Sequence, residues 1–200
     1  NRLNNCSLVN QNNDLSSNYL ESIPIKEELY PYVKSLNLNK NNIRFIKNTS
    51  FSFKTKYLIL LYLAQNRIEA IEFNAFFYLI NLEKLDLSMN LIKNIHFSVF
   101  WNLKNLIYLN LNSNEIDVLD NDLFLNFKVL TFLDISNCLI KRIDESSFIN
   151  LAELEVLKFE NNPYFIKINH EKTFVGLESI RTIYLSEILF DDDEKNTLEI

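Results

Sequence analysis

The sequence predicts an α/β solenoid, in which coils of chain stack side by side and each coil adds one strand to a parallel sheet. Three observations predict this architecture. One set of apolar positions recurs every 24 residues, two of these positions are separated by a single residue, and the chain has one Gly and three Pro in 200 residues. The recurrence indicates the coil, the spacing of two indicates a strand, and the scarcity of Gly requires turns made by other residues.

Four successive stretches that match without insertion define the repeating unit. In each, apolar residues occupy positions 1, 4, 6, 11, 14, 19 and 22, and Asn or Cys occupies position 9. An earlier unit is one residue longer, a later unit is two residues longer, and the last unit lacks the Asn. A degenerate first unit precedes them, matched in its middle by Leu15, Asn18, Leu20 and Ile23. The other units begin at Val33, Leu58, Leu82, Leu106, Leu130, Leu154 and Ile180.

Positions 4 and 6 place two apolar side chains on one face of a strand, which is the face toward the core. A single unit cannot bury that edge alone, so neighbouring units supply the core. We also expect position 19 to form a spine under the outer turns. Its members are Phe51, Phe76, Phe100, Phe124, Phe148 and Phe174.

Position 9 lies where the chain leaves the strand. An Asn amide there can donate to and accept from backbone groups buried between coils, whereas a thiol donates only weakly. Because Asn tolerates left-handed backbone better than other non-Gly residues, we expect asparagines to make the turns. The predicted ladder consists of Asn41, Asn66, Asn90, Asn114, Cys138 and Asn162.

The pattern LxxLxLxxNxLxxLxxxxFxxLxx resembles the leucine-rich repeat family over residues 10–190. Residues 20–24 and 32–38 resemble the N-terminal cap of extracellular members, with Toll-like receptors and insect leucine-rich repeat surface proteins as the comparison, and Cys6 resembles a remnant of that cap. Cys138 at position 9 resembles a known family substitution. The resemblance implies a right-handed horseshoe with the parallel sheet on its concave side and irregular or short-helical turns on its convex side.

We divide the chain into three parts. Residues 1–32 form a degenerate N-terminal cap and first half-repeat, residues 33–187 hold about six full repeats and a partial last one, and residues 188–200 form an acidic C-terminal end. The run at residues 191–194 lacks the alternating ligands and the Gly of a calcium loop, so we expect it to be solvated. A start at Asn1 is expected for a processed or excised piece, and no signal peptide is visible.

Composition and charge exclude several functions. A net charge of −6 and a pI of about 5.0 argue against nucleic acid or an anionic membrane as the partner. No apolar run approaches the roughly 18–20 residues that cross a bilayer, so we expect no membrane insertion. Two Cys and two His at wide spacing make no zinc site, and a single Gly allows no Gly-rich phosphate loop. We therefore expect neither a metal nor a cofactor.

Catalysis finds no support in the pattern. His96 and His170 lie three units apart at loop positions and have no Cys or Ser partner in register, so we expect solvated histidines and no enzyme. Cys6 and Cys138 are separated by some five units, which makes an internal disulfide between them implausible.

The side of the strands that faces away from the core is the candidate binding surface. Adjacent strands lie about 4.8 Å apart, so Tyr108 and Phe132 become neighbours there, with Ile107 close by. An exposed aromatic cluster flanked by charges is typical of a protein-binding hot spot. The alternative is that aromatic residues simply suit strand positions and stack on each other. The predicted contact residues are Leu60, Tyr62, Lys84, Asp86, Tyr108, Asn110, Phe132, Asp134 and Lys158.

Position 20 is apolar in five consecutive units. These side chains either form a stripe that mediates dimerisation or tuck under the next turn of the solenoid, and we favour the tucked arrangement. The residues at this position are Ser52, Phe77, Trp101, Leu125, Ile149 and Val175.

The pattern as a whole favours a protein-binding module. The resemblance implies an extracellular or cell-surface receptor or adhesion protein in innate immunity, with a protein ligand or co-receptor and a homo- or heterodimer as further options. Glycosylation sequons at Asn5 and Asn48 agree with secretion, and Asn48 falls on an outer loop. The scarcity of Cys favours the alternative, an intracellular scaffold or regulatory subunit that uses the same face.

Overall fold

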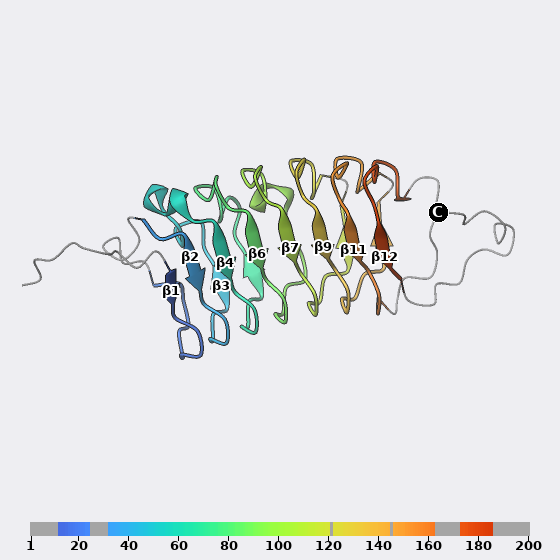
Figure 1. Ribbon diagram of the computed structural model, residues 1–200. Coiled ribbons are helices and arrows are strands. Elements are labelled where there is room, and N and C mark those ends of the chain that lie inside the picture. Colours follow the sequence, from blue (N-terminus) through green and yellow to red (C-terminus); the bar gives the residue numbers. More distant parts are fainter. Residues whose placement is uncertain (1–11, 25–31, 121, 145, 163–172, 186–200) are drawn as a thin grey trace, which may run out of the picture.

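The computed structural model describes residues 12–24, 32–120, 122–144, 146–162 and 173–185, and in it the coils of the chain stack into a solenoid (Figure 1). One sheet of eight strands runs along the stack in the order β1-β2-β4-β6-β7-β9-β11-β12. Its strands are β1 Asn12–Asp14, β2 Ser35–Asn37, β4 Leu60–Tyr62, β6 Lys84–Asp86, β7 Tyr108–Asn110, β9 Phe132–Asp134, β11 Val156–Lys158 and β12 Thr182–Tyr184.

Every pairing in this sheet is parallel and joins the same template position of adjacent coils. Leu85 pairs with Leu109 and Leu109 pairs with Leu133, for example, so the 24-residue step of the sequence is also the register of the sheet. Each inner strand has a buried central residue between two partly exposed ones, except at β9, where Asp134 is buried as well. The predicted fold class is confirmed.

The outer turns contain little helix. Two short parallel pairs lie there, β3 Phe45–Ile46 with β5 Ala70–Ile71, and β8 Val118–Leu119 with β10 Arg142–Ile143. Two single 3₁₀ turns complete them, η1 Phe53–Tyr57 and η2 Phe97–Val99. Each 3₁₀ turn begins with a side chain that accepts a backbone hydrogen bond, Ser52 before η1 and His96 before η2.

The core is continuous along the solenoid and contains the predicted leucines and phenylalanines. In the spine, the rings of Phe124 and Phe148 stack with centroids 6.0 Å apart. Phe127, at position 22, contacts both Phe100 at 5.5 Å and Phe124 at 6.0 Å, which fills the space between two spine members. At the N-terminal end, Leu15 and Leu20 pack against the same core, as expected for a degenerate first unit.

The asparagine ladder connects each coil to the one before it. The Asn90 Nδ2 group donates to the carbonyls of Leu63 and Leu87 at 3.0 Å each and to Ser88 at 3.1 Å, and its Oδ1 accepts from the Ile68 amide at 2.9 Å. One buried side chain therefore satisfies backbone groups of two coils. The equivalent inter-coil bonds are made by Asn41, Asn66, Asn114 and Asn162.

Cys138 leaves a gap in this ladder. Its Sγ lies 3.4 Å from the Leu111 carbonyl and 3.6 Å from that of Ser136, so it replaces part of the donor function. A thiol has no carbonyl oxygen that could replace the Oδ1 atom of Asn. In the neighbouring coil Asn114 Oδ1 accepts a hydrogen bond from the Ile92 amide, but in the described part of the chain the equivalent Ile116 amide has no such acceptor. Burial raises the pKa of the Cys138 thiol to about 11, so the group remains protonated.

The prediction that asparagines adopt the left-handed backbone is confirmed at only some of the turns. The residue with positive φ is usually at position 8, one residue before the ladder Asn. At position 8 it is Lys40, Gln65, Met89 and Ser113 in four coils and an Asn at Asn137 and Asn161, and a third left-handed Asn, Asn74, lies in an outer turn. Left-handed backbone costs about 1–2 kcal/mol in a residue other than Gly. The structure tolerates it because the ladder bonds that follow hold the turn in place.

Several sequence predictions lie outside the described residues and stay predictions. They concern the part of the N-terminal cap with Asn5 and Cys6, the loop with His170, and the acidic end at residues 188–200.

The ladder predicts a large effect for a small change. Replacing Asn90 by Ala removes bonds to buried backbone groups of two coils, so the free energy of unfolding should fall by about 1–3 kcal/mol. Chemical denaturation followed by circular dichroism measures this. Asn94→Ala is the matched control, because Asn94 is exposed and its variant should change stability by less than about 0.5 kcal/mol. Equal stability of the two variants would contradict the ladder's role.

The gap at Cys138 predicts the opposite effect. Cys138→Asn supplies the missing acceptor for Ile116 and a stronger donor to Leu111, so the free energy of unfolding should rise by about 1 kcal/mol. Cys138→Ala, which supplies neither, should not be more stable than the wild type. Thermal unfolding of the three proteins side by side tests this, and an Asn variant less stable than the Ala variant would refute it.

Candidate protein-binding face

The outward side chains of β4, β6, β7, β9, β11 and β12 form one surface, which we call the sheet face. It includes all nine contact residues predicted from the sequence and, in addition, Tyr184 of β12. Positions 3 and 5 of each coil contribute these residues, because the side chain between them points into the core. Most of the side chains are partly exposed.

A pair of stacked rings lies at the centre of the sheet face. The Tyr108 and Phe132 rings are 4.4 Å apart between centroids and inclined by only 4°. Lys84 Nζ lies 4.2 Å from the centroid of Tyr108, and Lys158 Nζ lies 5.7 Å from that of Phe132. The strand order places the two lysines on opposite ends of the ring pair, so each ring has a ring on one side and an ammonium group on the other.

The same contacts continue in both directions. Lys84 Nζ also lies 5.5 Å from the ring of Tyr62, and Lys158 Nζ lies 5.4 Å from that of Tyr184. An ammonium group over an exposed ring contributes about 0.5–1 kcal/mol, and a ring pair about 0.5–1.5 kcal/mol. These contacts hold the six side chains in order before any partner arrives. We call this set the aromatic ladder: Tyr62, Lys84, Tyr108, Phe132, Lys158 and Tyr184.

The acidic and amide residues predicted as ligand contacts also have a structural role. The Asp86 Oδ1 atom accepts from the Ser88 amide at 3.0 Å and from its hydroxyl at 2.6 Å, and Asp134 makes the same pair of bonds with Ser136. These bonds fix the turn at the exit of the strand. Asp134 is only 8% exposed, so a partner on the sheet face can make little direct contact with its carboxylate.

The carboxylate of Asp86 affects the pKa of Tyr108, which lies on the next strand. Burial raises the pKa of Tyr108, and the nearby Asp86 carboxylate raises it further. Tyr108 therefore remains protonated at physiological pH, and its hydroxyl can donate a hydrogen bond to a partner.

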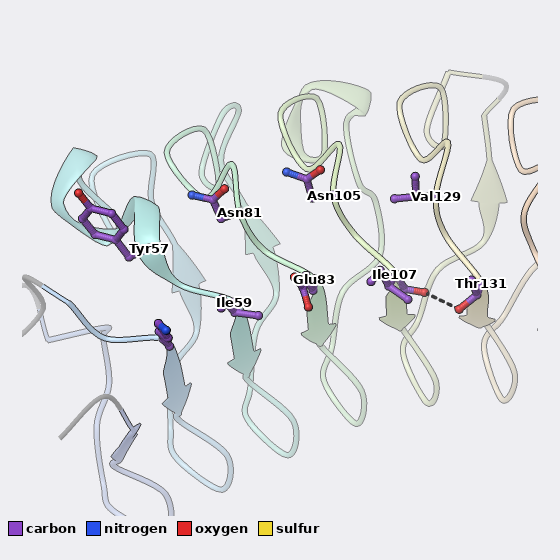
Figure 2. A pocket seen from close by; sticks show the side chains of 9 residues that line it. Tyr57, Ile59, Asn81, Glu83, Asn105, Ile107, Val129 and Thr131 are labelled. Carbon is purple, nitrogen blue, oxygen red and sulfur yellow. Dashed lines mark hydrogen bonds between the residues drawn. The ribbon is translucent and has the colours of Figure 1, made fainter.

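A groove adjoins the ladder and was not predicted from the sequence. It has a volume of ≈ 540 Å³, runs along the edge where the chain enters the strands, and is shown in Figure 2. One row of its lining residues immediately precedes the strands, and the other row lies two residues earlier. The sequence did contain a signal for this groove, because apolar residues occupy template positions that need no core contact. They are Ile59, Ile107 and Val129. The lining residues are Lys34, Tyr57, Ile59, Asn81, Glu83, Asn105, Ile107, Val129 and Thr131.

Position 20 differs from the prediction that its side chains tuck under the next turn. Phe77 and Trp101 are 47% and 43% exposed, and Ile149 and Val175 are exposed as well. The preceding spine residue already fills the interior, so the next side chain turns outward. Ser52 and Leu125 are partly exposed, and the tucked arrangement is therefore wrong for most of this position.

His96 and Asn48 are found on outer loops. The His96 ring is exposed, lies 2.8 Å from the Ser98 hydroxyl through Nδ1, and contacts the ring of Phe97. Asn48 is exposed in a turn, and its backbone amide donates to Glu72 at 3.0 Å. Within the described ranges, no three His, Cys, Asp or Glu side chains gather as a metal site would require. No helix in that part of the chain is long and apolar enough to span a membrane.

Comparison with known proteins agrees with this geometry. The family model described as leucine rich repeat matches three overlapping stretches, residues 31–92, 80–140 and 128–187, which together cover 31–187 without a gap. Among curated proteins, none matches the chain.

The electrostatic environment of Tyr108 predicts a measurable shift. Asp86→Asn removes the negative charge but retains a side-chain oxygen for the turn, as Asn110 does in the next coil. The pKa of Tyr108 should fall toward its ordinary value without reaching it, because burial remains. Phenolate absorbance against pH measures this, with a Tyr108→Phe protein to identify the signal. Asp117→Asn is the charge control, and an unchanged or higher pKa in Asp86→Asn would contradict the assignment.

Proposed function

Because the chain belongs to the leucine-rich repeat family, we propose that it is a protein-binding module that recognises its partner through the sheet face and the adjoining groove. We further propose that it is part of a cell-surface or secreted recognition or adhesion receptor, of the Toll-like or insect kind, with a role in innate immunity. The aromatic ladder is the observation that carries the first proposal.

The ladder supports binding for two physical reasons. Aromatic side chains are enriched at protein interfaces, and Tyr is one of the residues that most often contributes a large share of the binding energy. Their mutual contacts restrict their rotamers in advance, so little conformational entropy is lost when a partner docks. The groove offers a neighbouring apolar depression for a partner side chain, at the rim where Ile107 and Tyr108 are consecutive.

The second candidate is an intracellular scaffold or regulatory subunit that uses the same face. Cys138 is a free, buried thiol, which is compatible with a reducing compartment. The exposed sequon at Asn48 supports the extracellular candidate instead. Glycosidase-sensitive mobility of the protein from its own source would favour the secreted receptor, and a cytosolic fraction without any glycan would favour the scaffold.

Removal of the central rings tests the binding proposal. The double variant Tyr108→Ala, Phe132→Ala should raise the Kd for the partner at least about 30-fold, because the loss of one hot-spot residue alone has an effect of this size. Its free energy of unfolding should fall by no more than about 1.5 kcal/mol, because the rings lie outside the core. The partner is identified as the protein that binds to immobilised wild-type chain but not to the immobilised double variant.

Ile149→Ala is the matched control for this experiment, since Ile149 is an exposed apolar residue in the turn between β10 and β11 and not on a strand of the sheet face. It should retain the partner with unchanged Kd. Unchanged affinity in the double variant would refute the proposal, and so would a loss of folding that parallels the loss of binding.

A further inference from the structure

An exposed cluster of rings lies on the outer turns of two adjacent coils, away from the sheet face. Phe73 and Phe97 occupy equivalent places in these coils, and so do Phe77 and Trp101. The rings of Phe97 and Trp101 are 5.8 Å apart, and the His96 ring lies 4.6 Å from Phe73 and 4.3 Å from Phe97. We use the name outer aromatic patch for five residues of these turns. They are Phe73 (65% exposed), Phe77 (47%), Tyr78 (40%), Phe97 (39%) and Trp101 (43%).

The size of the outer aromatic patch limits what can cover it. Each ring residue has about 200 Å² of surface, of which about half is exposed, so the patch amounts to about 500 Å². Patches of this size on monomers are often functional. A stable protein interface needs about 800 Å² on each side, so the patch is too small to bind a second copy of the chain by itself.

The sequon residue Asn48 lies next to this patch. Strands β3 and β5 pair Ile46 with Ile71, and two residues further the same register places Asn48 opposite Phe73. The Asn48 backbone amide donates to the Glu72 carboxylate at 3.0 Å, which confirms that the two loops are adjacent there. Both side chains are exposed, and no described residue hydrogen-bonds the Asn48 carboxamide.

We propose that Asn48 carries an N-linked glycan whose first sugars lie over the outer aromatic patch. This inference rests on the secreted part of the proposed function. The patch and the sequon are independent observations that point to the same chemistry. The C–H faces of a sugar ring pack on aromatic faces while its hydroxyls stay in water, which suits rings that are half exposed. The glycan thereby covers an apolar surface that would otherwise favour aggregation.

The modification is a group transfer from a lipid-linked diphosphate oligosaccharide, supplied with its transferase by the secretory pathway. The Asn48 Nδ2 atom forms a bond to the anomeric carbon of the first sugar, the bond from that carbon to the phosphate oxygen breaks, and the lipid diphosphate leaves with the electron pair. The carboxamide proton passes to a base of the transferase. Transfer precedes folding, so the burial of the Ser50 hydroxyl in the folded turn does not oppose it.

Trp101 provides a direct test because it is the only Trp in the chain. The 200-residue chain, secreted by a eukaryotic host with a foreign leader, is analysed by glycopeptide mass spectrometry and should carry the glycan at Asn48. Enzymatic removal of the glycan should shift the Trp101 emission to longer wavelength, increase its quenching by acrylamide and lower the Tm by about 2–4 °C. If the chain is not secreted, in vitro translation in the presence of microsomes still measures whether Asn48 is glycosylated.

Three variants control this experiment. Enzymatic removal leaves Asp at position 48, so Asn48→Asp that has received the same enzyme treatment has the same charge and should match the treated wild type. Phe73→Ala should abolish most of the difference between glycosylated and treated protein. Ile149→Ala, an exposed apolar residue of another outer turn, should leave the difference unchanged.

The proposal is overturned if Asn48 carries no glycan, or if removal of the glycan leaves the Trp101 emission and quenching unchanged. It is also overturned if the glycosylated chain forms a dimer that Trp101→Glu converts to monomer, because a second copy then occupies the patch. These failures leave the sheet-face proposal intact, since partner affinity of the Tyr108→Ala, Phe132→Ala variant measures that separately.

Discussion

The buried amide at position 9 is the constraint on which the structure depends. A coil that leaves the sheet must turn while its backbone is already covered by its neighbours, so its polar groups cannot be hydrated. Asn90 satisfies four such groups, three as donor and one as acceptor, and it does so across two coils. The same inter-coil bonds recur in every described coil whose position 9 is Asn, which keeps these repeats in register and supports the left-handed residue before each Asn.

This register has a consequence for the outer surface. When equivalent positions of adjacent coils lie side by side, side chains of similar kind at those positions must contact each other. The Tyr108 and Phe132 rings therefore stack almost in parallel, and the spine ring Phe148 does the same with Phe124 inside. The lysines at the ends of the ring pair occur at different positions, Lys84 at position 3 and Lys158 at position 5, because their long stems reach either row.

The sequence predicts those features that repeat. The strands, the buried leucines, the phenylalanine spine and the ladder all follow from side-chain periodicity, and Cys138 appears in the ladder as an exception that the sequence already shows. The left-handed residues Lys40 and Met89 were not predicted from residue type, because the position in the turn sets the backbone conformation there and side chains as different as Lys and Met adopt it. The exposed Trp101, the turn bonds of Asp86 and the groove depend on how neighbouring coils fill space, which a single-residue pattern does not record.

Outside the core, the repeat places no demand on side-chain polarity, so apolar residues there require another explanation. They are found on three surfaces of the same central coils, the aromatic ladder, the groove and the outer aromatic patch. The ladder and the groove share a rim at Ile107 and Tyr108, so a single partner can cover both. Part of the patch lies in the turn after β5 and the rest at η2 of the next coil, and Asn48 follows β3, which pairs with β5. The glycan that we propose at Asn48 would cover the patch without occupying the sheet face, so the proposed glycan and the proposed protein partner do not compete for the same surface.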